Sequence, residues 1–239
     1  MAVTHKIQSF KDILKDRKNW LNVIGPALFI SINWLVFIWA VSNNYLIETS
    51  LGYYINPLVL TMFGAVFFKE RLNGLQKIGL GFATIGVLLK SITYGKIPYI
   101  SLTLAISFSL YGLLKKKSKL KSLDGLGFET LVISIPSLLY LAGAKSKGLG
   151  IIGNLPWYFW LLIAFSGIAT AVPLLFYSES TKLLPLNVVG FLQYIAPTII
   201  LLLGIFVYGE SFDLYSLIAF ILIWIGLGFF SYSQYRYLK

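Results

Sequence analysis

Eight long apolar runs follow one another along this 239-residue chain, with only short connections between them. A helix needs roughly 20 predominantly apolar residues to cross the hydrocarbon core of a bilayer. Hydrophobic residues make up 57% of the chain and charged residues only 12%, a balance that excludes a water-soluble domain. We therefore predict an all-α integral membrane protein with eight transmembrane helices, at 20–42, 47–68, 74–93, 97–114, 126–143, 156–178, 185–208 and 213–233.

The residue types that most enzymes and metal proteins depend on are scarce. The chain has no cysteine, and its only histidine is His5, in the polar N-terminal segment. A metal centre or a histidine base inside the membrane is thereby excluded. The nine acidic residues are scattered over the N-terminal segment, the loops and the ends of the spans, whereas a membrane-embedded enzyme would cluster them at one face. We predict no enzyme activity, no metal and no cofactor.

Basic residues are distributed unevenly between alternate loops. With the N-terminus inside, 16 of the 20 Lys and Arg residues fall in inside segments, and only Lys90, Lys96, Lys145 and Lys147 fall outside. This positive-inside pattern explains the net charge of +11 better than nucleic-acid binding does. It predicts a multi-pass protein of the bacterial plasma (inner) membrane with both termini in the cytoplasm. Residues 1–19 are predicted to form a cytoplasmic amphipathic segment, with a plain solvated tail as the alternative.

Two segments of the chain, 51–90 and 191–230, repeat one pattern at an offset of 140 positions. Basic residues (Lys69, Arg71 and Lys77) lie near the first repeated glutamate but not near the second, as expected if the two turns lie on opposite sides of the membrane. An inverted-topology repeat is therefore predicted. The matching positions are Tyr54 to Pro57 with Tyr194 to Pro197, Gly64 with Gly204, Glu70 with Glu210, and Gly86 with Gly226.

Neutral polar residues and prolines occur at mid-span depth. Amide side chains in hydrocarbon must find partners, so two interpretations remain open: hydrogen bonds between helices, or the lining of a central cavity. The two repeat-related prolines each free a backbone carbonyl and are predicted to be paired breaks, with a tyrosine about one turn away from each. The predicted substrate pathway consists of Asn33, Tyr54, Asn56, Pro57, Gln193, Tyr194 and Pro197.

Two further patterns concern helix ends and helix packing. Glu70 and Glu210 follow their spans, where a carboxylate can cap the next helix or, alternatively, take part in gating. Gly79, Ala83 and Gly86 place small residues on one helix face, which predicts close helix packing.

The residues around the repeated motif resemble those of a known family. The stretches 33–41, 48–58, 191–198 and 208–210 resemble the RarD-type permeases, in the EamA branch of the drug/metabolite transporter superfamily. The resemblance implies ten helices in two inverted repeats of five. The eight spans are then a remnant without the first two helices: 20–93 is a partial first repeat of three helices, and 97–233 is a second repeat of five.

The resemblance also implies a function. It points to a secondary permease that moves a small organic metabolite or drug across the membrane by alternating access, the RarD group being named for chloramphenicol sensitivity. The alternative is a truncated, non-transporting or accessory membrane protein, arising from a misplaced start or a truncated gene. The expected partners are a small-molecule solute and the lipid bilayer, with a homodimer left open.

Overall fold

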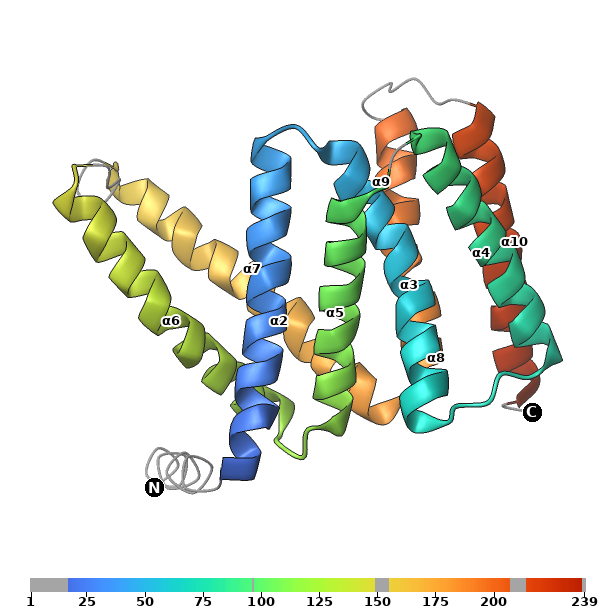
Figure 1. Cartoon of the computed structure of the whole chain (residues 1–239), viewed down its shortest axis with the longest axis horizontal. Coiled ribbons are helices and arrows are strands. Elements are labelled where there is room, and N and C mark those ends of the chain that lie inside the picture. Colours follow the sequence, from blue (N-terminus) through green and yellow to red (C-terminus); the bar gives the residue numbers. More distant parts are fainter. Residues whose placement is uncertain (1–16, 96, 149–154, 207–213, 238–239) are drawn as a thin grey trace. The chain divides into compact units, whose positions relative to one another are not determined.

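The regular structure of the chain is α-helical. The computed structural model describes residues 17–95, 97–148, 155–206 and 214–237, and no strand occurs in these ranges. The predicted all-α class is confirmed, while most of the predicted segment 1–19 lies outside the described residues. The helices, coloured along the chain in Figure 1, are α2 (Arg17–Ser42), α3 (Leu46–Phe68), α4 (Gly74–Tyr94), α5 (Tyr99–Lys117), α6 (Ser122–Ser146), α7 (Trp157–Leu183), α8 (Leu186–Leu192), α9 (Ile195–Phe206) and α10 (Leu214–Tyr237).

Six of the described helices, α2, α3, α4, α6, α7 and α10, are long and apolar enough to cross a membrane. The other two predicted spans differ from this pattern. The span 97–114 corresponds to α5, which ends in three lysines, and the span 185–208 is divided between α8 and α9. The count of eight transmembrane helices and the origin of the repeat therefore stay predictions.

Pro197 accounts for the break between α8 and α9. A proline has no N–H, so the carbonyl four residues earlier, on Gln193, loses its helical partner. Pro197 is the third residue of α9, within the first turn, where a missing N–H removes no helical hydrogen bond. Pro57 lies inside the continuous helix α3, where the Thr61 hydroxyl donates to its carbonyl at 2.8 Å. The prediction of paired breaks is therefore wrong for Pro57.

The chain divides into two compact units, and the boundary passes through α2 and α5. The first unit contains α2 up to Ser31 and the segment Leu114–Leu183, which includes α6 and α7. The second unit contains Ile32–Leu113 and the chain from Leu184 onward, which includes α3, α4, α8, α9 and α10. Each unit has a polar cluster of its own.

In the second unit, α4 and α10 lie side by side (Figure 1), and at Gly79 and Gly86 they approach so closely that a side chain would not fit. A Cβ atom added to Gly79 would lie 2.6 Å from the Gly226 carbonyl oxygen, and one added to Gly86 would lie 2.7 Å from the Ala219 carbonyl oxygen. The predicted close packing is confirmed. The two contacts run in opposite directions along the helices, so α4 and α10 are antiparallel. Gly79 and Ala219, like Gly86 and Gly226, are 140 positions apart, so the repeat interchanges the two contacts.

Candidate functional site

Three polar side chains from three helices meet inside the second unit. Asn56 of α3 donates a hydrogen bond from Nδ2 to Gln193 Oε1, and the Ser109 hydroxyl of α5 donates to Asn56 Oδ1 at 2.7 Å. Asn56 and Ser109 are buried, and Gln193 is half-buried at the end of α8. We call these three residues the amide cluster. Two of the seven predicted pathway residues, far apart in the sequence, are thus in direct contact.

The amide cluster contains one amide nitrogen whose two N–H donors are unused among the described residues. The Nε2 atom of Gln193 is buried and has no hydrogen-bond partner within the part of the chain that the structure describes. An unsatisfied buried donor costs about 1–3 kcal/mol, so native proteins rarely retain one without a reason. A polar group of a bound solute would remove this cost.

Gly190 allows α8 to approach α3 closely enough for the amide contact to form. A Cβ atom on Gly190 would lie 2.8 Å from the Pro57 carbonyl oxygen and 3.1 Å from Thr61 Oγ1. Any side chain here would push α8 away from α3 and separate Gln193 from Asn56. The first copy of the repeat has Ser50 at the corresponding position, so the sequence comparison alone did not single out this glycine.

Tyr54 and Tyr194, which correspond in the repeat, also meet. The Tyr194 hydroxyl donates to the Tyr54 carbonyl oxygen at 3.2 Å. Both tyrosines are buried in a hydrophobic cluster, where the Tyr54 and Phe220 rings form a T-shaped pair at a centroid distance of 5.1 Å. Both side chains therefore join helices of the second unit in this structure.

The remaining pathway residues occupy different positions. Asn33 bonds α5 separately from the amide cluster: its Nδ2 donates to the Leu104 carbonyl at 2.9 Å and to Ser107 Oγ at 3.0 Å. For Asn33, the structure therefore matches the first of the two interpretations, a hydrogen bond between helices. Pro57 contacts α8 through its carbonyl, and Pro197 is buried in the first turn of α9. Convergence of all seven residues on one cavity stays a prediction.

Glu70 caps a helix, though not the one that follows it. The helix α4 is capped by Asn73, whose Oδ1 accepts from the Gln76 N–H at 3.0 Å while Gln76 Oε1 accepts from the Asn73 N–H at 2.9 Å. The Glu70 carboxylate instead accepts hydrogen bonds from the first two amides of α8. Glu210, its counterpart in the repeat, lies outside the described residues.

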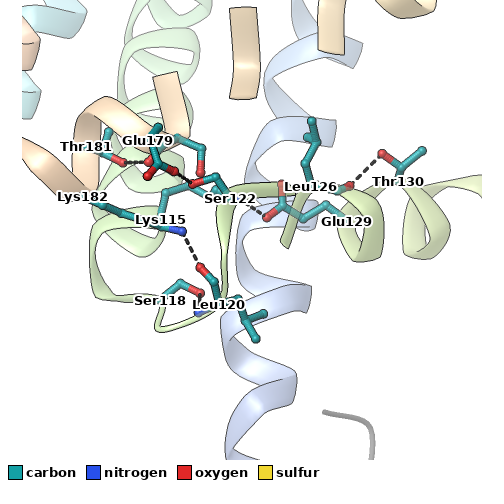
Figure 2. A network of polar contacts seen from close by, with 11 residues as sticks. Lys115, Ser118, Leu120, Ser122, Leu126, Glu129, Thr130, Glu179, Thr181 and Lys182 are labelled. Carbon is teal, nitrogen blue, oxygen red and sulfur yellow. Dashed lines mark hydrogen bonds and ion pairs between the residues drawn. The ribbon is translucent and has the colours of Figure 1, made fainter. Parts of the chain in front are cut away.

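The first unit holds a charged cluster that sequence reasoning missed (Figure 2). Lys115 Nζ lies 2.7 Å from Glu129 Oε1, and each side chain is only 2% exposed. Nearby contacts join the α5–α6 turn and the start of α6 to the end of α7. The Ser122 hydroxyl donates to Glu179, and Lys182 donates to the Leu120 carbonyl. We call Lys115, Ser122, Glu129, Glu179 and Lys182 the ionic cluster.

The acidic residues were expected to be scattered, and for Glu129 and Glu179 this is wrong. The structure extends both helices beyond the predicted spans: α6 starts four residues earlier, which brings Ser122 into it, and α7 continues past Glu179 to Leu183. Glu129 and Glu179 therefore lie on helices that pack together. Gly125 leaves room for the ammonium group, because a Cβ there would lie 3.1 Å from Lys115 Nζ. Among the described residues, no group of three or more His, Cys, Asp or Glu is arranged to hold a metal ion.

Comparison with known proteins gives consistent matches along the chain. The profile of the EamA-like transporter family matches twice, at residues 3–92 and 97–232. The uncharacterized transporter YojE of Bacillus subtilis is 46% identical over 232 residues, which are 94% of this chain and 74% of that protein. The protein RarD of Escherichia coli is 35% identical over 230 residues, covering 96% of this chain and 78% of RarD.

Two other similar proteins extend this comparison. A chloramphenicol-sensitive protein RarD of Pseudomonas aeruginosa is 30% identical over 224 residues, which are 92% of this chain and 74% of that protein. A solved crystal structure, at 19% sequence identity, superposes with a TM-score of 0.65 and covers 95% of this chain and 81% of its own. At that identity the likeness concerns the fold alone.

Proposed function

Because the chain belongs to the EamA-like transporter family, we propose that it is a secondary permease that moves a small organic metabolite or drug by alternating access. It is a multi-pass membrane protein of a bacterial transporter family. The transporter names of its relatives support this proposal over a non-transporting or accessory membrane protein. The same relatives support a protein that is not an enzyme.

The observation that carries the proposal is the amide cluster at the end of α8. Non-helical backbone at membrane depth is tolerated where it is buried in protein or lines a water-filled cavity, and discontinuous helices form the substrate sites of many transporters. Here the break at Gln193 and Tyr194 places an unused Gln193 donor beside Asn56. A site made of neutral amides and a hydroxyl selects its solute by hydrogen bonds. The proposed pathway includes the seven residues predicted from the sequence.

Two observations support an inverted repeat as the frame of this pathway. The family profile matches the chain twice, and the repeat offset interchanges the two glycine contacts between α4 and α10. A two-fold axis that relates two antiparallel helices is perpendicular to both of them. If α4 and α10 cross the membrane, this axis lies in the membrane plane, as in an inverted-topology repeat.

We propose that the protein lies in the bacterial inner membrane with both termini in the cytoplasm. This orientation rests on the 16 basic residues in the inside segments. Reporter fusions test it: fusions at Lys119 and at the C-terminus should report the cytoplasm, and a fusion at Ser146 should report the outside. An outside signal at Lys119 would reverse the proposed orientation.

Transport itself is tested with purified protein in liposomes. The probe solutes are labelled chloramphenicol, which relates to the name of one relative, and a labelled metabolite extract from cells grown on labelled glucose. Vesicles that contain the protein should exchange at least one labelled compound against the same unlabelled compound faster than protein-free vesicles do. If folded, correctly inserted protein exchanges no labelled compound from either source, the permease proposal fails.

A further inference from the structure

Glu70 joins two helices that are more than one hundred residues apart in the sequence. It follows α3, and its Oε1 accepts from the Leu186 N–H at 2.8 Å while its Oε2 accepts from the Asn187 N–H at 3.1 Å. The residue before α8 is Pro185, whose side chain provides no cap. Glu70 therefore satisfies two first-turn amides that have no partner within the helix, and its charge suits a helix N-terminus.

The turn after α3 and a glycine in its last turns leave room for the Glu70 carboxylate. Lys69 adopts a left-handed conformation, with φ 55°, and the turn is closed by a hydrogen bond from the Glu70 N–H to the Gly64 carbonyl at 3.1 Å. A Cβ atom on Gly64 would collide with Glu70 Oε2 and would lie 3.2 Å from Leu186 Cβ. Gly64 therefore leaves room both for the carboxylate and for the start of α8.

The opposite end of α8 carries the candidate site. At seven residues, α8 is too short to be stable alone, so its position along α3 depends on tertiary contacts. These contacts are Glu70 at its start, Gly190 against the Pro57 carbonyl in its middle, and Gln193 against Asn56 at its end. A shift at the first contact is passed along one helical segment to the last.

We propose that Glu70 is a positioning residue of the solute site: it fixes the register of α8 on α3 and so holds Gln193 against Asn56. The effect on transport rests on the permease function proposed above, whereas the effect on helix register rests on geometry alone. Glu70 acts through α8.

The same turn offers a matched control. Asn73 caps α4, a helix that contributes no residue to the amide cluster, so Asn73→Ala removes a helix cap and leaves α8 untouched. Glu70→Gln removes the charge and one of the two acceptor oxygens. Glu70→Asp keeps the charge on a shorter side chain. If Glu70 and Asn73 had only structural roles, Glu70→Gln and Asn73→Ala would both lower stability without changing the register of α8 or the KM of transport.

The register of α8 is measured with two spin labels. The chain has no native cysteine, so Met62→Cys on α3 and Leu192→Cys on α8, whose native side chains are 53% and 51% exposed, are the only labelling sites. The interlabel distance distribution should be narrow with Glu70 in place and equally narrow in Asn73→Ala. It should shift or broaden in Glu70→Gln, with Glu70→Asp in between.

The transport assay provides the second readout. For the compound that the parental protein exchanges, Glu70→Gln should raise KM several-fold with a smaller change in maximal rate, while Asn73→Ala should leave KM unchanged. Parental distances and KM in Glu70→Gln would overturn the inference, as would identical changes in both variants. If Glu70→Gln does not fold, Glu70→Asp is judged by the same criteria. If the parental protein exchanges no compound, the permease proposal fails and the spin-label distances alone decide the register inference.

Discussion

The amide cluster of the second unit and the ionic cluster of the first unit meet the same physical problem in opposite ways. Both contain polar groups buried within helices that pack together. In the ionic cluster, Lys115 and Glu129 neutralise each other at 2.7 Å. In the amide cluster every group is neutral, and Gln193 Nε2 has no partner among the described residues. Paired buried charges are costly to separate, so they suit a permanent structural contact. An unused neutral donor suits a solute that binds reversibly.

The largest effect is expected from breaking the buried ion pair. Lys115→Met removes the ammonium group that lies 2.7 Å from the buried Glu129 carboxylate, and Glu129→Leu removes the carboxylate that faces the buried Lys115 ammonium group. Each single change should lower the free energy of unfolding by about 3–5 kcal/mol. Reversible unfolding in mixed micelles measures the loss.

The double variant Lys115→Met/Glu129→Leu is the control for that experiment. Because both charges are gone, its stability should return to within about 1 kcal/mol of the parental value. A double variant as unstable as the sum of the singles would show that packing, and not charge, dominates the ionic cluster.

Pro197→Ala should change stability less than the ion-pair variants do, and it should affect transport more. The new N–H can bond the Gln193 carbonyl and extend the helix across the break, which moves the Gln193 side chain away from Asn56. Amide exchange at Ile195 and Ala196, the first amides of α9, should slow because a continuous helix would give them partners, and transport should fall. The control is Pro57→Ala: α3 is already continuous there, so this change should stabilise the protein by up to about 3 kcal/mol. Equal changes in exchange at the break in both variants would contradict this explanation.

The smallest effect is expected from Ser122→Ala, which removes the hydrogen bond to Glu179 within the ionic cluster. A bond to a charged group is worth about 1.5–3 kcal/mol, and because Glu179 is exposed to solvent the loss should not exceed the lower end of this range, with a correspondingly small fall in the thermal midpoint. Ser137→Ala is the matched control on the same helix, because the exposed Ser137 hydroxyl bonds only to the Ile133 carbonyl in the described structure. The thermal midpoint of Ser137→Ala should stay near the parental value. If both variants lower the midpoint equally, the bond between Ser122 and Glu179 does not stabilise the protein.

Features with a local sequence signal could be predicted. Long apolar runs fixed the helical class, and the glycines of α4 and α10 predicted close packing, because both depend on residues near in sequence or regular in spacing. Asn56 and Gln193 could be selected because amides at membrane depth must find partners. The sequence could not show that they bond each other, since this depends on how α8 packs on α3.

Features that depend on helix ends or on tertiary contacts could not be predicted. Pro57 and Pro197 have the same sequence context, yet only Pro197 follows a break, because it can sit in the first turn of a new helix. The partner of Glu70 lies 116 residues away and is recognised only after folding. Glu129 was placed near a span end because hydropathy does not register the polar first turns of α6.

The most direct measurement compares solute exchange by variants of the amide cluster and of the ionic cluster in liposomes of the same composition. Asn56→Leu and Gln193→Leu keep a similar side-chain volume and remove the amide contact, and Lys115→Met/Glu129→Leu removes the ionic one. The amide variants should insert and accumulate like the parental protein but lose most of the exchange of the labelled compound, while the ionic double variant keeps it. Parental exchange rates in both amide variants, or their poor insertion and degradation, would show that the amides only pack helices together and contradict their place in the solute pathway.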